Sequence, residues 1–112
     1  MSADGNTICQ LDDIEDGGSA AFSATLDGTE TALAAVRRGD RVFVYINVCP
    51  HIGSPLDFSP GQFLSLDRAH IQCSTHGALF RIKDGHCISG PCAGAGLTPV
   101  AVRVENGAVV LV

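Results

Sequence analysis

Two short stretches decide how this sequence is interpreted. The first is Cys49-Pro-His51-Ile-Gly53-Ser-Pro-Leu56, and the second is Cys73-Ser-Thr-His76-Gly77-Ala-Leu-Phe80. Each stretch couples one thiolate to one imidazole, and His51 and Cys73 lie 22 positions apart. Zinc sites more often carry two cysteines in a Cys-x-x-Cys spacing. Cys-x-His followed by Cys-x-x-His instead favours a [2Fe–2S] cluster, with two cysteines on one iron and two histidines on the other.

A third stretch, Ser89-Gly90-Pro91-Cys92, follows the second at a short distance. In this order the three stretches resemble the two ligand loops and the proline loop of Rieske proteins, and in particular the small Rieske ferredoxins. The resemblance is close over residues 49–92 and extends loosely over nearly the whole chain. Two motifs in order, with glycines in register, are far more specific than either motif alone.

The resemblance implies a cofactor, its ligands and a function. Cys49, His51, Cys73 and His76 would hold one Rieske-type [2Fe–2S] cluster. The chain would then be a soluble electron carrier and not an enzyme in its own right. It would take one electron at a time from a flavin-dependent NAD(P)H reductase and pass it to a terminal oxygenase. The sequence offers no nucleophile–base pair and no phosphate-binding glycine loop that would argue for another chemistry.

Two alternatives remain open at this stage. The chain could be the small Rieske redox subunit of an enzyme complex such as nitrite reductase. It could also be a zinc-stabilised binding module, because tetrahedral zinc would use the same two cysteines and two histidines. The zinc alternative leaves Gly53, Gly77 and the Gly90-Pro91 turn unexplained.

The resemblance also predicts where the reduction potential lies. High-potential Rieske proteins carry one further cysteine in each ligand loop, but this chain has Ser54 and Thr75 there. They also offer a serine and a tyrosine hydroxyl to the cluster, where this chain has Ala78 and Phe80. Hydrogen bonds to the sulfurs raise the potential. We therefore expect the low end of the Rieske range of about −150 to +300 mV.

Strand signals dominate the rest of the chain. Runs rich in β-branched and aromatic residues alternate with glycine-containing turns, and Asn106-Gly107 between two apolar runs is a strong hairpin signal. The expected strands are 7–11, 20–25, 31–38, 41–48, 70–72, 78–83, 99–105 and 108–112. They predict an all-β fold, a small antiparallel sandwich or barrel. The resemblance adds a division of the single domain into a basal part, 1–46 and 97–112, and an inserted cluster-binding subdomain, 47–96.

Composition limits the partners and the location. The net charge is −5, with seven acidic residues and no basic one among the first 30 residues. This acidic region is either a solvated face or a docking face for a basic redox partner. No basic stripe indicates nucleic-acid binding, and no run of 18 apolar residues indicates a membrane span. Without a secretory signal, we expect a cytoplasmic monomer.

The remaining cysteines and histidines have simpler interpretations. Cys9, Cys87 and Cys92 are expected to be small apolar residues, although a Cys87–Cys92 disulfide is conceivable. His70 is expected to be structural, and His86 is expected to be exposed after a turn.

Overall fold

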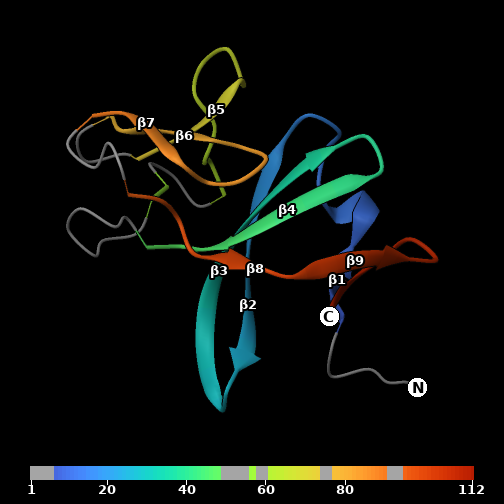
Figure 1. Cartoon of the computed structure of the whole chain (residues 1–112). Coiled ribbons are helices and arrows are strands. Elements are labelled where there is room, and N and C mark those ends of the chain that lie inside the picture. Colours follow the sequence, from blue (N-terminus) through green and yellow to red (C-terminus); the bar gives the residue numbers. More distant parts are fainter. Residues whose placement is uncertain (1–6, 49–55, 58–60, 74–76, 91–94) are drawn as a thin grey trace.

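A computed structural model describes residues 7–48, 56–57, 61–73, 77–90 and 95–112 (Figure 1). Within these ranges the chain forms ten strands and one short 3-10 turn, and no helix there is long and apolar enough to cross a membrane. The elements are β1 (Thr7–Gln10), η2 (Leu11–Asp13), β2 (Ser19–Leu26), β3 (Thr29–Arg38), β4 (Arg41–Ile46), β5 (His70–Gln72), β6 (Leu79–Arg81), β7 (Cys87–Ser89), β8 (Pro99–Val100), β9 (Val102–Glu105) and β10 (Ala108–Leu111).

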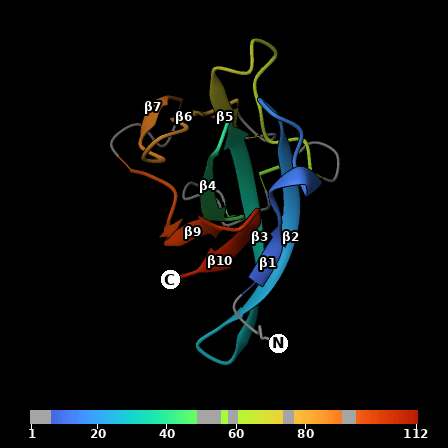
Figure 2. The same ribbon diagram turned by 90° about the vertical axis from the view of Figure 1, so that its right-hand side faces the viewer.

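These strands form three antiparallel sheets, so the predicted all-β fold is confirmed. Their strand orders are β1-β10-β9, β2-β3-β4-β8 and β5-β6-β7. Figure 2 shows the first two sheets crossing in the lower part of the molecule, with the third sheet above them. The β2–β3 hairpin is the longest in the fold, with paired residues from Ser19↔Val36 to Leu26↔Thr29.

Strand β3 is buried on both of its faces. Leu33 and Ala35 belong to one core, which they share with the sheet β1-β10-β9. Ala34 and Val36 point the other way, into a second core with residues of the sheet β5-β6-β7. Successive side chains of a strand point to opposite faces, so a strand between two layers needs apolar residues throughout. The alanines leave room for a layer on each side, which explains why a strand forms despite their low β-propensity.

Most of the predicted strands are confirmed with small shifts at their ends, but one is wrong. The expected strand over 99–105 divides at Ala101 into β8, which pairs with β4, and β9, which pairs with β10. One continuous run of alternating apolar residues therefore supplies strands to two different sheets. The break between them is visible only in the strand pairing of the folded chain. The short strand β7 and the 3-10 turn η2 were not predicted. The turn between β9 and β10 has Asn106 at φ 51° and Gly107 at φ 80°, as the Asn-Gly signal predicts.

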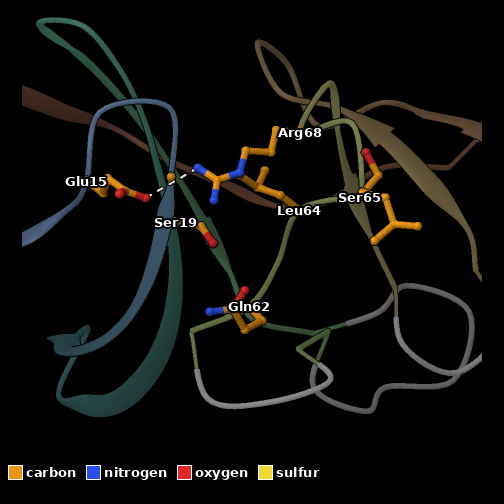
Figure 3. A pocket seen from close by; sticks show the side chains of 8 residues that line it. Glu15, Ser19, Gln62, Leu64, Ser65 and Arg68 are labelled. Atoms are coloured by element: carbon orange, nitrogen blue, oxygen red, sulfur yellow. Dashed lines mark hydrogen bonds and ion pairs between the residues drawn. The ribbon is translucent and has the colours of Figure 1, made fainter.

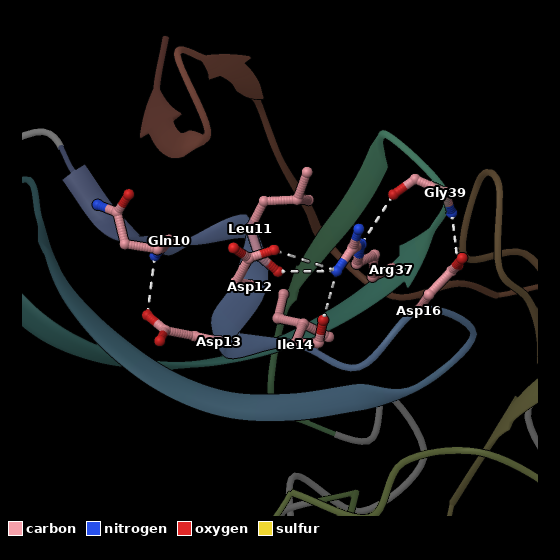
Figure 4. A network of polar contacts seen from close by, with 8 residues as sticks. All are labelled: Gln10, Leu11, Asp12, Asp13, Ile14, Asp16, Arg37 and Gly39. Carbon is pink, nitrogen blue, oxygen red and sulfur yellow. Dashed lines mark hydrogen bonds and ion pairs between the residues drawn. The ribbon is translucent and has the colours of Figure 1, made fainter.

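Arg37 binds the connection between β1 and β2 to the sheet β2-β3-β4-β8, which we call the central sheet (Figure 4). Its side chain is only 17% exposed. Nη1 donates to the carbonyl oxygens of Ile14 at 3.0 Å and Leu11 at 3.4 Å, and Nε donates to the carbonyl of Gly39 at 2.8 Å. The carboxylate of Asp12 lies 3.9 Å from Nη1 and is almost fully exposed, so it adds little.

Candidate metal centre

The structure describes one of the four predicted ligands, Cys73. The other three, Cys49, His51 and His76, lie outside the described residues, as do Pro91 and Cys92 of the third stretch. Within the described ranges, no group of three or more His, Cys, Asp or Glu side chains is placed to hold a metal ion. The site can therefore be built from Cys73 and from the described residues at the ends of each stretch.

Cys73 follows β5 directly, in the connection between β5 and β6. These two strands form an antiparallel hairpin with Ile71 opposite Phe80. The backbone N–H of Cys73 donates to the carbonyl of Ala78 at 2.9 Å, and the N–H of Gly77 donates to the carbonyl of Cys73 at 3.0 Å. Gly77 has φ 68°, a conformation that glycine adopts without steric cost. The second stretch therefore begins directly after one strand of a hairpin and ends in the other.

The surroundings of Cys73 are apolar and closed to solvent. Cys73, Ile71 and Phe80 are fully buried, and Ala78 is 1% exposed. All four belong to the core beneath the sheet β5-β6-β7. A dry environment with few hydrogen-bond donors suits the thiolate ligand of an iron–sulfur cluster and lowers its potential. Ala78 and Phe80 bring no side-chain donor to this region.

The two ends of the first stretch are joined by a side chain. Asn47, which follows β4, is 9% exposed, and its Oδ1 accepts a hydrogen bond from the backbone N–H of Leu56 at 2.7 Å. Its Nδ2 donates to Oδ1 of Asp57 at 3.2 Å. Oδ2 of Asp57 in turn accepts the backbone N–H of Gly61 at 3.2 Å. We call Asn47 and Asp57 the amide clamp, because they hold the residues before and after positions 49–55 together.

Sequence reasoning missed the amide clamp, although one signal was present. Asn47 is the first polar residue after five apolar residues of β4, and it comes two positions before Cys49. A polar residue at the end of a buried strand must find hydrogen-bond partners. Its hydrogen-bond partner, Asp57, lies ten positions further along the chain, and this spacing matches no known motif.

The third stretch approaches the second very closely at Gly90. A Cβ atom on Gly90 would lie 2.8 Å from Cα of Ala78, and Gly90 has φ 103°. Both the distance and the conformation require glycine at this position. Gly90 therefore packs directly against the backbone of Ala78, whose carbonyl accepts the N–H of Cys73.

Tyr45 fixes the sheet β5-β6-β7 to the central sheet. Its hydroxyl donates to the carbonyl of Ile82 at 2.5 Å, and a Cβ atom on Gly85 would lie 2.8 Å from its ring. Burial, together with the nearby Asp84 carboxylate, raises the pKa of Tyr45 to about 12. The phenol therefore stays protonated and keeps donating. Tyr45 belongs to β4, the strand that leads to Asn47 and the first stretch. Its hydrogen bond to Ile82 therefore connects the strand before the first stretch to the sheet that carries the second.

The side chains around the hollow in Figure 3 hold neighbouring segments of the chain together. It encloses about 270 Å³ between β2 and the segment that precedes β5. Arg68 Nη1 lies 3.3 Å from Oε1 of Glu15 across it, and both side chains are exposed. Ser19 Oγ donates to the carbonyl of Gly61 at 2.7 Å and accepts from the N–H of Phe63 at 3.2 Å. These bonds fasten the segment that follows the first stretch onto β2.

The remaining cysteines and histidines fit their simpler interpretations where the structure describes them. Cys9 and Cys87 are buried, and the disulfide considered between Cys87 and Cys92 involves a residue outside the described ranges. His70 begins β5 and is half-buried, whereas His86 is exposed.

Comparison with known proteins identifies the family. The model of the Rieske [2Fe-2S] domain matches residues 5–106. The ferredoxin of carbazole 1,9a-dioxygenase from Nocardioides aromaticivorans IC177 is 25% identical, with a TM-score of 0.74 over 94% of this chain and 93% of that one. The Sphingomonas yanoikuyae B1 ferredoxin is 28% identical, with a TM-score of 0.72 over 94% of each chain.

Two further structures extend this comparison. A chain from the complex of reduced oxygenase and oxidized ferredoxin in carbazole 1,9a-dioxygenase is 27% identical, with a TM-score of 0.72 over 94% of this chain and 89% of that one. A putative small subunit of NADPH nitrite reductase is 21% identical, with a TM-score of 0.67 over 95% of each chain, which shows a shared fold alone. No curated protein matches the chain.

The cofactor follows from the family and fits the residues present. A Rieske-type [2Fe–2S] cluster needs thiolate and imidazole donors, and the motif cysteine that the structure describes is buried in an apolar, closed environment. The family model also spans nearly the whole chain, including every strand of the fold except β10. The chain belongs to the Rieske [2Fe–2S] domain family, and its cofactor is a Rieske-type cluster.

Proposed function

We propose that the chain carries single electrons from a flavin-dependent NAD(P)H reductase to a terminal oxygenase. The observation that carries the proposal is the similarity, over nearly the full length of both chains, to ferredoxins at 25–28% identity. One of those is the ferredoxin of a carbazole dioxygenase, and a related ferredoxin occurs in a complex with its reduced oxygenase. The electron carrier itself breaks and forms no substrate bond.

The proposed ligands are Cys49 and Cys73 on one iron and His51 and His76 on the other. A bound Rieske cluster takes up and gives back one electron, at a higher potential than an all-cysteine cluster because two ligands are neutral. The proposal includes the division into a basal part, 1–46 and 97–112, and a cluster-binding subdomain, 47–96. The sheet β5-β6-β7 supports that division, because its three strands all lie within 47–96 and pair with each other.

The surrounding residues would position the ligands and exclude water. The backbone bonds between Cys73 and Ala78 fix one cysteine at the hairpin end. The amide clamp of Asn47 and Asp57 fixes the ends of the stretch that holds the other pair. Phe80 closes the core behind Cys73. Rigid support of this kind lowers the structural change that accompanies each electron transfer.

Single-turnover kinetics test the proposal. The chain is reduced anaerobically by NADH and a flavoprotein reductase, then mixed with a terminal oxygenase of the carbazole dioxygenase type. We expect the oxygenase to reoxidise the chain at a rate that rises with oxygenase concentration. Cys9→Ala is the matched control for Cys73→Ala, because both cysteines are buried but only Cys73 belongs to a motif. The control should keep the transfer, and Cys73→Ala should abolish it.

A second candidate is a redox subunit within an enzyme complex. The shared fold with a putative nitrite reductase small subunit favours it, over 95% of each chain. The two candidates differ in assembly, since a carrier would be an independent monomer and a subunit would co-purify with a larger chain. Gel filtration of the protein from its own cells distinguishes them, and fractionation of the same cells tests the proposed cytoplasmic location.

A further inference from the structure

A second hollow lies between the turn that joins β3 to β4 and the beginning of β5. It encloses about 340 Å³. Its lining combines cationic and apolar side chains from the strands β3, β4, β5 and β6 and from the segments before β5 and after β6: Arg38, Arg41, Phe43, Ala69, His70, Arg81, Ile82 and Lys83. We call it the basic hollow. It holds four of the seven Lys and Arg residues of a chain whose net charge is −5.

Three of the cations around the basic hollow have no acidic partner among the described residues. Within the described part of the chain, the ion pairs involve Arg37, Arg68, Arg81 and Arg103. Arg38, Arg41 and Lys83 are exposed and make none. Arg38 donates only to a backbone carbonyl, that of Arg68.

The acidic groups nearby do not cancel this charge. Asp84 is bound by Arg81, through contacts of 3.0 Å and 2.6 Å, and its pKa is lowered chiefly by that side-chain bond. Asp67 is held by Ser65, whose hydroxyl lowers its pKa. Asp40 lies in the turn between Arg38 and Arg41 and is exposed. Asp16 Oδ1 accepts a hydrogen bond from the N–H of Gly39 in the same turn at 2.8 Å. Four cations thus face three neighbouring carboxylates, Asp16, Asp40 and Asp84, with Asp67 on the segment beyond. None of these carboxylates belongs to the lining, so the charge of the lining itself is positive.

The floor of the basic hollow is apolar. Ile82 is 8% exposed and belongs to the core, and Phe43 is half-buried and packs against that core. Ala69 and the half-buried ring of His70 form the remaining wall. A carboxylate that enters this hollow would meet cations at the rim, and a neighbouring apolar side chain would cover the floor. Such a combination resembles the apolar centre and charged rim of protein interfaces.

The strands that line the basic hollow lead to the ligand stretches. Strand β4 runs from Arg41 to Ile46, a distance of about 17 Å at the usual rise per residue, and ends three positions before Cys49. Strand β5 runs from His70 to Gln72, a distance of about 7 Å, and Cys73 follows it directly. One partner covering about 800 Å² of surface, which is typical of a specific complex, would reach both the hollow and the end that carries Cys73. Contact at the hollow would leave the ligand end accessible to that same partner.

We propose that the basic hollow binds an acidic segment of a redox partner protein, with a carboxylate side chain at the rim and an adjacent apolar side chain on the floor. The inference rests on the proposed function for the kind of partner, and it adds how that partner is oriented. Charge at the rim would steer the partner toward the hollow, and the apolar floor would fix the position of the bound segment. The hollow is also open to solvent, which leaves room for a protein segment to enter it.

Peptide binding tests the proposal without any electron transfer. The cluster-loaded chain is titrated calorimetrically at low ionic strength with a blocked hexapeptide of alternating glutamate and leucine. Two comparison peptides replace glutamate by glutamine or leucine by glycine. We expect binding of the first peptide only, weakening as salt is added. Arg41→Gln and Lys83→Gln should each weaken it about fivefold. Arg103→Gln removes the same charge from the exposed strand β9 and should change it less than twofold.

Three results would overturn the proposal. The first is no binding of the glutamate–leucine peptide by the unaltered chain, and the second is equal weakening by Arg103→Gln, which would indicate net charge alone. The third is equally tight binding of glutarate, which would make the hollow a small-anion site. Unchanged visible spectra show that each variant keeps its cluster. Peptide binding without electron transfer to an oxygenase would contradict only the proposed function.

Discussion

The two stretches that carry the proposed ligands are supported in different ways. The second stretch is held by backbone hydrogen bonds at the end of the β5–β6 hairpin, between Cys73 and Ala78. Among the described residues between β4 and β5, none belongs to a strand, and the ends of the first stretch are joined through the side chains of Asn47 and Asp57. Backbone support tolerates most side-chain substitutions, whereas side-chain support depends on two particular residues. The two stretches can therefore be disturbed independently.

Gly90→Ala should have the largest effect, on the second stretch. The new Cβ would lie 2.8 Å from Cα of Ala78, and φ of 103° adds strain. We expect a loss of about 3 kcal/mol in the free energy of unfolding, from overpacking together with an unfavourable φ. Chemical denaturation measures it, and release of iron to a chelator should accelerate in parallel.

Gly28→Ala is the matched control for Gly90. Gly28 has φ 80°, but nothing lies within 4 Å of a Cβ atom there. It should lose only the conformational part, about 1 kcal/mol. Equal losses at the two positions would mean that the close approach to Ala78 contributes nothing.

Asn47→Ala should have the next largest effect, on the first stretch. It leaves the N–H of Leu56 without its acceptor and Oδ1 of Asp57 without its donor. Asn47 is only 9% exposed, so water replaces these bonds poorly. A buried group left unsatisfied costs about 1–3 kcal/mol. We expect a loss of about 2 kcal/mol in denaturation and faster release of iron.

An exchange of the two clamp residues provides the control. In Asn47→Asp with Asp57→Asn, the carboxylate accepts from the N–H of Leu56 and from the new amide at position 57. The carbonyl oxygen of that amide still accepts from the N–H of Gly61. The double variant should therefore recover most of the stability lost in either single variant. A double variant no better than the sum of the two singles would contradict the clamp.

The comparison also shows what sequence can and cannot predict. The Cys and His motifs and the hairpin signals are local patterns, so the family, the cofactor and most strands followed from them. The break at Ala101 could not be predicted, because the apolar alternation continues while the pairing partner changes from β4 to β10. The bond between Asn47 and Asp57 joins residues ten positions apart whose spacing matches no motif. The basic hollow gathers residues from 38 to 83, which only the fold brings together.

The reduction potential depends on the second stretch, where Ala78 and Phe80 offer no donor. We expect cyclic voltammetry to give a potential at the low end of the Rieske range, and a value clearly above about +100 mV would contradict this. Ala78→Ser should raise it by about 60 mV, which corresponds to one hydrogen bond of about 1.5 kcal/mol to a charged group. Phe80→Leu adds no donor and should leave the potential nearly unchanged.

At neutral pH the smallest effect is expected at Cys9, in β1 and outside both stretches. Burial, with a lesser contribution from Asp13, raises the pKa of the Cys9 thiol from 9.0 to about 11. The folded chain then binds this proton more tightly than the unfolded chain. The resulting stability is complete below pH 9 and is lost as the pH rises toward about 11. The loss should approach 1 kcal/mol per pH unit in that window.

Denaturation at pH 8, 9, 10 and 11 measures this dependence. Cys9→Ala should flatten the curve between pH 9 and 11 and leave iron binding unchanged at neutral pH. Tyr45, whose pKa is about 12, contributes a similar loss at higher pH in both proteins. An unaltered slope in Cys9→Ala would show that the thiol does not titrate in this window.

The most direct test of the central claim is the EPR spectrum of the dithionite-reduced protein, with iron and zinc counted in the same sample. Mixed cysteine and histidine ligation predicts a rhombic signal whose average g value lies below that of the free electron, with about two irons per chain. Cys49→Ala and Cys73→Ala should each abolish the signal, and Cys9→Ala should keep it. A sample without signal that contains about one zinc per chain would contradict the electron-carrier account and support a structural zinc module.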